Sequence, residues 1–272
     1  MSTIAPDRDF FIIGCQRSGT TLLKLILECH RAVRCFDEHF GYQILANPSL
    51  RPPPTNGKQY TGFKTPRLTE QFLQKTFRDH DLSDFPNHYS APHLLFIVRD
   101  VRDTIVSMFA LRTGNGCWFE RWGLPAITQK LKTDCTFSAR YQAIWNFACA
   151  SEEPLLAAAA VYWRYKSESL LEYRNDDIPI HLVRYEDLVG APESELRLIC
   201  NWLGVAWDSS LLTHGNHPHE GIFANGLTIG NTDPTLAIHD SSVRSWRKYF
   251  SRRQEQIVMQ LAGPLHDELY PR

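Results

Sequence analysis

The chain has 272 residues, and its 29 lysines and arginines against 30 aspartates and glutamates give a formal net charge of -1. Hydrophobic residues make up 43% of the chain and charged residues 22%, which is typical of a globular protein with a sizeable core. The balanced charge argues against a protein whose main partner is nucleic acid or an acidic membrane surface, because such partners select a strong basic excess.

The cysteines and the N-terminus predict the compartment. Seven cysteines are an odd number, and no C-x-x-C pair occurs, so neither a disulfide framework nor a zinc knuckle is suggested. The segment Met1 to Asp9 carries Asp7, Arg8 and Asp9 before only four apolar residues, which is too short for a signal-peptide core or a membrane span. We therefore expect a cytoplasmic protein.

Short apolar runs alternate with helical patterns along the chain. Three runs predict buried strands: Phe10 to Ile13, Leu94 to Val98 and Ile178 to Val183. Each is followed by a helical pattern: Thr20 to Cys29, Asp100 to Leu111 and Pro192 to Leu203. Another long helix is expected over Glu152 to Tyr173. This alternation predicts a single α/β domain over residues 1–272, with three layers and a central parallel sheet flanked by helices.

Three segments lack a clear period. Pro52 to Pro54 and the Gly/Asn-rich stretch His214 to Asn231 are interpreted as surface loops. Residues 112–146 contain glycines and tryptophans with weak periodicity, and we interpret them as an insertion over a functional site.

The segment Gly14 to Thr21 lies between the first predicted strand and the first predicted helix. Backbone N–H groups of such a loop converge on an anion at the helix N-terminus. The spacing is that of a Walker A loop, but Thr20 stands where a nucleotide triphosphatase places its lysine. Arg17, inside the loop, offers a planar fork suited to oxyanions. We expect a P-loop-type phosphate site that does not hydrolyse ATP; the alternative is that Gly14 and Gly19 merely shape a turn.

A second anion site is expected after the next strand. Arg99 follows Val98, and Ser107 lies about two helical turns further on, so both groups can share one phosphate. The alternative is a surface arginine that pairs with Asp100 or Asp103.

Taken together, five separated motifs resemble those of the sulfotransferases that use 3′-phosphoadenosine 5′-phosphosulfate, PAPS. They lie at Gly14 to Thr21, Lys64 to Arg67, Phe96 to Ser107, Val183 to Leu188 and Val243 to Arg247. The resemblance implies that the 5′ end of the donor is bound by Arg17, Ser18, Gly19, Thr20 and Thr21. It further implies that Arg99 and Ser107 bind the 3′-phosphate, that Tyr185 meets the adenine, and that Arg244 or Arg247 closes over the 3′-phosphate.

The same residues predict a chemistry for the site. Sulfuryl transfer needs in-line positioning and neutralisation of the charge that grows on the leaving oxygen, for which Lys64 and Arg17 are the candidates. Because the leaving group is already a stable anion, we predict that no metal is required. Glu38 is the candidate general base, in a segment that resembles the base-bearing loop of protein-tyrosine, glycosaminoglycan and bacterial sulfotransferases. Small-molecule members carry a histidine base where this chain has Pro66.

Several alternatives stay open. His39 competes with Glu38 as the base, and Glu38 itself could be a helix cap or a solvated carboxylate. His214, His217 and His219 could bind a metal, although a solvated loop is favoured, and Trp246 is expected in the core. The acceptor is a hydroxyl, less readily an amine, of a small molecule, lipid, sugar or peptide, with residues 112–146 shaping the choice. Other functions are a P-loop small-molecule kinase and a non-catalytic module that binds PAPS or its product, adenosine 3′,5′-bisphosphate (PAP).

Overall fold

The computed structural model describes residues 8–46, 57–71, 93–175, 178–219, 221–222, 226–228 and 230–271. The predicted loop Pro52 to Pro54 lies outside these residues. Five parallel strands form the central sheet in the order β2-β3-β1-β4-β7. Their bounds are β1 Arg8–Gly14, β2 Val33–Phe36, β3 Tyr60–Lys64, β4 His93–Val98 and β7 Ile180–Arg184. The predicted α/β fold with a central parallel sheet is confirmed.

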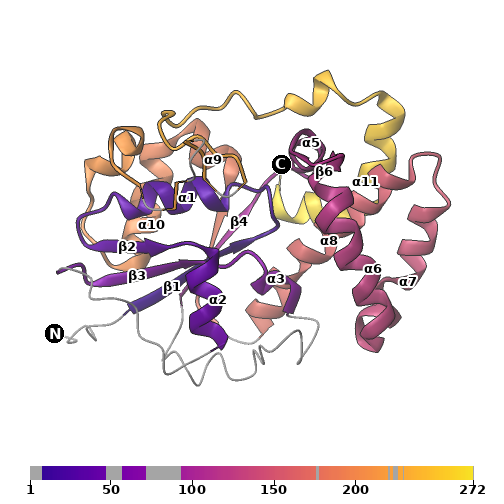
Figure 1. Ribbon diagram of the computed structural model, residues 1–272, viewed down its shortest axis with the longest axis horizontal. Helices are drawn as coiled ribbons and strands as arrows, with labels where there is room; N and C mark the ends of the chain where they lie inside the picture. Colours follow the sequence, from indigo (N-terminus) through magenta and orange to yellow (C-terminus); the bar gives the residue numbers. More distant parts are fainter. Residues whose placement is uncertain are drawn as a thin grey trace.

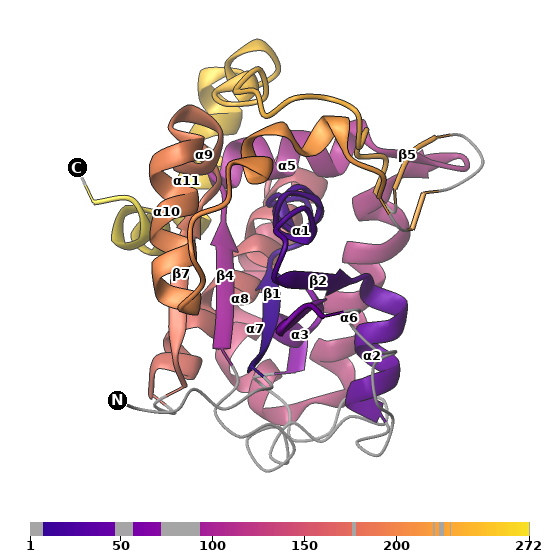
Figure 2. The same cartoon turned by 90° about the vertical axis from the view of Figure 1, so that its left-hand side faces the viewer.

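Helices cover both faces of the sheet (Figure 1). In chain order they are α1 Thr20–Glu28, α2 Glu38–Ala46, α3 Leu68–Gln71, α5 Val101–Ala110, α6 Leu124–Thr133, α7 Cys135–Cys149, α8 Pro154–Asn175, α9 Tyr185–Gly190, α10 Pro192–Leu203 and α11 Arg252–Leu269. The described residues also form the π-helical segment η2 Phe119–Gly123 and the 3₁₀ segments η3 Ser209–Asn216 and η4 Ser245–Lys248. Figure 2 shows β7, β4, β1 and β2 following one another across the sheet.

The alternation of side chains along the strands divides the core into two layers. On β1, Phe11 belongs to the core that includes residues of α5, α8 and α11, whereas its neighbour Phe10 belongs to the core beside α1 and α10. On β4, Phe96 and Ile97 divide in the same way. Successive side chains of a strand point to opposite faces, so a continuous apolar run indicates a strand buried on both sides.

Strands β2 and β3 were not among the strands predicted from the sequence. Both are short, and β3 contains Gly62, where an added Cβ would come within 2.4 Å of the Phe10 ring. The register pairs Gly62 with both Cys35 and Phe10, so the glycine lets the neighbouring strand carry a large aromatic side chain. The glycine in β3 is explained by close packing against the neighbouring strand, and the segment has no periodic pattern that would predict a strand.

Residues 112–146 fold into a β5–β6 hairpin followed by η2, α6 and most of α7; the hairpin strands are Arg112–Thr113 and Gly116–Cys117. Phe119, Ile127 and Phe137 are buried in the same core as α8. Much of this segment is therefore a packed helical layer, and its influence on the acceptor stays a prediction.

Candidate active site

The carboxyl ends of the five parallel strands bring the predicted residues to one edge of the sheet. Strand β2 is followed by Asp37 and Glu38, and its neighbour β3 ends in Lys64. Strand β1, in the middle of the sheet, is followed by the loop 15–19. Strand β4 is followed by Arg99, and the edge strand β7 by Tyr185. Ligands bind at this edge in open α/β sheets because loops and helix N-termini converge there. The sheet therefore assembles groups that are far apart in the chain.

The loop between β1 and α1 has a conformation that requires its glycines. Gly14 has φ 150°, and an added Cβ would lie 2.2 Å from the carbonyl oxygen of Ile97 on β4. Gly19, with φ 101°, precedes α1 and lies against Tyr185, since an added Cβ would come within 2.5 Å of that ring. Arg17 also has a positive φ, of 74°. The glycines thus permit close packing as well as the turn.

A cavity of about 260 Å³ joins the two predicted anion sites. Seven of the nine predicted donor-binding residues line it: Arg17, Gly19, Thr20, Thr21, Arg99, Ser107 and Tyr185. Ser18 is buried within the loop, and its hydroxyl has no partner among the described residues. The residues of the two predicted anion sites therefore line one cavity.

The guanidiniums of Arg17 and Arg99 contact carbonyl and hydroxyl oxygens. Arg17 donates to the hydroxyl of Ser107 at 3.1 Å and to the carbonyl of Gly230 at 2.7 Å. Arg99 donates to the carbonyl of Arg17 at 3.3 Å and to that of Ser242 at 2.9 Å. Burial, and then the charge of Arg99, lower the pKa of Arg17 to about 10. Arg99 is buried and Arg17 is half-buried, and two neighbouring cations whose described partners are neutral favour the binding of an anion.

Tyr185 begins α9 and forms another wall of the cavity. The guanidinium carbon of Arg99 lies 4.5 Å from the centre of its ring, and its hydroxyl pairs with that of Ser242 at 2.7 Å. Ring and cation are held together in a cation–π contact.

Lys64 is the centre of a second charged cluster. Its ammonium group is fully buried and lies 3.1 Å from each of three oxygens, which belong to Thr21, Asp37 and Glu38. Thr21 also lines the cavity, so this residue connects the Lys64 cluster with the cavity that Arg17 and Arg99 line. Glu38 is the first residue of α2, with 24% of its side chain exposed. The arrangement brings together a cation, a hydroxyl and two carboxylates next to the phosphate loop.

Two alternatives for the base can be compared with Glu38. His39 is exposed and pairs with Gln43 on its own helix. Asp37, which sequence analysis did not select, lies as close to Lys64 as Glu38 does. Its adjacency to Glu38 was the available signal, but only the structure shows that both carboxylates reach one ammonium group.

The two arginines predicted near the C-terminus lie outside the cavity lining. Arg244 and Arg247 are exposed and are not among the residues that line the cavity. Trp246 is buried, as expected, with the guanidinium carbon of Arg102 4.1 Å from the centre of its ring. The backbone N–H groups of Arg244 and Trp246 donate to Asp103. Binding of the 3′-phosphate by Arg244 or Arg247 stays a prediction.

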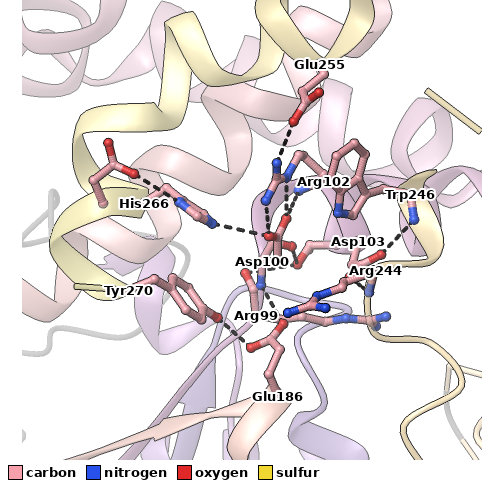
Figure 3. Close-up of polar contacts among 12 residues, drawn as sticks. Arg99, Asp100, Arg102, Asp103, Glu186, Arg244, Trp246, Glu255, His266 and Tyr270 are labelled. Carbon is pink, nitrogen blue, oxygen red and sulfur yellow. Dashed lines mark hydrogen bonds and ion pairs between the residues drawn. The ribbon is translucent and has the colours of Figure 1, made fainter. Parts of the chain in front are cut away.

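A polar network supports the end of β4 (Figure 3). The carboxylate of Asp100 pairs with Arg102 at 2.6 Å and with His266 of α11 at 3.3 Å. Burial opposes the charge of Asp100, but hydrogen bonds from His266 and Arg102 hold its pKa well below the usual value. Glu186 accepts from the Asp100 N–H and from the Tyr270 hydroxyl, while burial raises its pKa. The residue next to Arg99 is thereby anchored to α9 and α11.

Residues 231–239 supply a wall that sequence analysis missed. Asn231, Thr232, Asp233, Leu236, Ala237 and His239 line the cavity. The segment has no regular period, so its path over the cavity carried no signal in the sequence.

The expectation of a solvated histidine loop is wrong for two of its three members. His214 is fully buried in η3, and burial, then the charges of His219 and His217, lower its pKa to about 4. The side chain of His219 is 2% exposed, and it pairs with Glu28 and with the carbonyl of His214. Within the described residues, no group of three or more metal-ligating side chains is arranged to hold a metal. Contacts with α1 explain the burial of this segment.

Comparisons with known proteins identify relatives of the whole chain. A family model described as "Sulfotransferase domain" matches residues 7–264. A curated relative from Caenorhabditis briggsae, a putative protein-tyrosine sulfotransferase, is 21% identical over 243 residues, which are 89% of this chain and 81% of the relative.

Solved structures share the fold. A sulfotransferase domain from the curacin biosynthetic pathway has a TM-score of 0.56 at 17% identity, covering 96% of this chain and 99% of the other. The sulfotransferase domain of the Synechococcus PCC 7002 olefin synthase has a TM-score of 0.56 at 18% identity, covering 96% and 94%. A mouse sulfotransferase complexed with PAP has a TM-score of 0.51 at 14% identity, covering 96% and 88%.

No helix in the described ranges combines the length and the apolar character that a membrane span requires.

Proposed function

The chain belongs to the sulfotransferase family, and from this premise we propose that it moves a sulfuryl group from PAPS to the hydroxyl group of an acceptor. The observation that carries the proposal is the single cavity lined by both Arg17 and Arg99. A ligand with anionic groups at two ends of an adenosine matches two cationic groups in one cavity.

The residues that line the cavity, together with the adjoining Ser18, fit such a donor. The side-chain hydroxyl of Ser18 and the Nε of Arg99 are buried without a hydrogen-bond partner in the described part of the chain. Leaving buried polar groups unpaired is costly, so oxygens of a bound phosphate or sulfate would stabilise them. We assign Arg17, Ser18, Gly19, Thr20 and Thr21 to the 5′ end, Arg99 and Ser107 to the 3′-phosphate, and Tyr185 to the adenine.

Lys64 and Arg17 are proposed to stabilise the charge that develops during transfer. PAPS supplies the sulfuryl group on a phosphate that leaves as a stable anion. The buried ammonium of Lys64 donates to the hydroxyl of Thr21, and both Thr21 and Arg17 line the cavity. Preorganised cations of this kind stabilise developing negative charge more strongly than water does. We therefore expect no metal requirement.

Glu38 is proposed as the general base. Its carboxylate takes the proton of the acceptor hydroxyl while the acceptor oxygen bonds to sulfur and the bond from sulfur to the phosphate oxygen breaks. The ion pair with Lys64 places this carboxylate next to the phosphate loop, and its partial exposure leaves room for an acceptor. A carboxylate at this place can serve both as base and as an electrostatic partner of Lys64.

Ligand selectivity tests the proposal. Thermal unfolding of the full chain should show stabilisation by PAP, of about 2.7 kcal/mol at a hundredfold excess over its Kd. ATP with magnesium should stabilise less, because Thr20 replaces the lysine that grips a triphosphate. Stronger stabilisation by ATP with magnesium would favour a kinase and contradict the proposal.

An assay of transfer separates an enzyme from a binding module. Radiolabelled sulfuryl transfer should persist in EDTA, and the first acceptors to test are tyrosine-containing peptides, in view of the relative named above. Phenols, sugars and lipid alcohols complete the panel of hydroxyl acceptors. PAP binding without transfer to any of them would favour the non-catalytic module.

A further inference from the structure

Asp103 is a buried carboxylate to which the proposed reaction gives no task. It lies in the first turn of α5, is 1% exposed, and does not line the cavity. Its Oδ2 accepts from the backbone N–H of Arg244 at 2.7 Å. Its Oδ1 accepts from the hydroxyl of Ser245 at 2.8 Å and from the backbone N–H of Trp246 at 2.9 Å. Figure 3 shows this carboxylate facing the segment that carries Arg244 and Trp246.

The bound segment has a backbone conformation that needs support. Arg244 has φ 59° and ψ 20°, in the left-handed region. A residue other than glycine keeps this conformation only when surrounding contacts hold it. Asp103 provides hydrogen bonds, and Arg102 on the same helix stacks on the Trp246 ring. Helix α5 thus holds residues 244–246 through two adjacent side chains.

Ser242 connects the held segment to the cavity. It lies two residues before Arg244, and its carbonyl accepts from the guanidinium of Arg99 at 2.9 Å. Its hydroxyl pairs with the hydroxyl of Tyr185 at 2.7 Å. Arg99 and Tyr185 both line the cavity and contact each other. Movement of residue 242 would therefore disturb two donor-binding groups together.

We propose that Asp103 is a positioning residue of the donor site. By holding residues 244–246 it fixes Ser242, and Ser242 fixes the guanidinium of Arg99 and the ring of Tyr185 for the 3′-phosphate and the adenine. This inference rests on the proposed function, because it assumes that the cavity binds the donor. Preorganisation of this kind contributes to affinity, since the ligand need not order the groups that receive it.

Asp103→Asn tests the proposal with PAP as the probe. The asparagine amide keeps one acceptor oxygen, but its NH₂ group cannot accept a hydrogen bond from a backbone N–H. The hydrogen bonds that hold residues 244–246 are therefore weakened with little change in side-chain volume. Calorimetric titration of the full chain should show PAP binding about tenfold weaker than in the wild type. In sulfate transfer, the KM for the donor should rise by a similar factor, while kcat at saturating donor changes by less than about twofold.

A matched control separates positioning from general loss of stability. Asp134 is also buried and also accepts a backbone hydrogen bond, from Phe137 at 2.9 Å, but it caps α7 and does not line the cavity. Asp134→Asn should bind PAP as the wild type does. In an Arg99→Ala background, Asp103→Asn should cost much less affinity than it does alone, because coupled residues are not additive.

The outcomes distinguish the two claims. Ser245→Ala removes one of the three donors and should weaken PAP binding by about two- to threefold, which keeps the test available if Asp103→Asn does not fold. Wild-type protein that does not bind PAP would overturn the proposed function and, with it, this inference. Wild-type binding together with unchanged affinity in the variants, or equal losses in both backgrounds, would overturn the inference alone.

Discussion

Two cationic centres lie at the same edge of the sheet and have different partners. Arg17 and Arg99 donate to carbonyl and hydroxyl oxygens, whereas Lys64 lies between Asp37 and Glu38. The pKa of Arg17 is lowered by burial and by Arg99, which indicates that the cavity places cations close together. The charge of Lys64 is compensated within the protein by the carboxylates of Asp37 and Glu38.

The difference supports the separate tasks proposed for the two centres. An anionic ligand stabilises the cavity strongly, because the cations there have only neutral partners in the described residues. The ligand offsets the repulsion between the two arginines and the desolvation of their charges. A compensated cluster keeps charged groups ready without a ligand, which suits a base and a charge stabiliser. Binding and proton transfer should therefore respond to different substitutions.

The largest effect is expected from Glu38→Gln. Removing a general base costs about 10²–10⁴ in rate, so kcat should fall by this factor while the Kd for PAP stays nearly unchanged. Radiolabelled transfer and calorimetry measure the two quantities. Asp37→Asn is the matched variant, because both carboxylates lie 3.1 Å from Lys64.

A much smaller rate loss is expected for Asp37→Asn. The reverse order would assign the base to Asp37, and a large loss of PAP affinity in Glu38→Gln would contradict the separation of the two centres.

The next effect contrasts two cations. Arg99→Ala should weaken PAP binding by about 10–100-fold, the equivalent of losing a charge-assisted hydrogen bond. The free protein should lose less than about 1 kcal/mol of unfolding free energy, because the substitution also removes repulsion from Arg17. Lys64→Met should instead lower the unfolding free energy by about 1–3 kcal/mol, because two carboxylates lose their cation but are partly exposed to water.

Chemical denaturation without ligand measures this contrast. If Arg99→Ala proves the more destabilising substitution, the cations of the cavity stabilise the free protein, and the contrast between the two centres is wrong.

The smallest effect is a dependence on alkaline pH. Burial and Arg99 lower the pKa of Arg17 to about 10, and a bound anion favours the charged guanidinium. PAP affinity should therefore stay constant up to about pH 9 and fall as the pH rises through the pKa, by roughly fourfold at half a unit above it. Calorimetry follows the affinity, and circular dichroism checks that the fold persists. Arg17→Ala should lack this dependence; an equal fall in that variant would assign the titration to another group.

Local sequence patterns predicted many of the residues that line the cavity. Gly14 and Gly19 marked the loop, Arg99 stood at the end of an apolar run, and Ser107 followed on the next helix. Each signal depends on neighbours within a few residues, because glycine conformations and strand ends are local properties. The structure then placed these residues in one cavity.

Other parts of the site depend on contacts between distant segments. The segment 231–239 covers the cavity without a regular period, and Asp103 accepts hydrogen bonds from residues about 140 positions away. His214 is buried although its Gly/Asn-rich surroundings indicated a solvated loop. Such contacts leave little trace in local composition, because burial depends on what other segments cover.

The sequence by itself determined the alternation of strands and helices, the loop that follows the first strand and the residues at the strand ends, since these follow from periodicity and local backbone preferences. Only the tertiary structure decided the strand order, which lines up Glu38, Lys64, the phosphate loop, Arg99 and Tyr185 along one edge. Strand order depends on which faces and edges bury their side chains best, and that is a property of the whole chain.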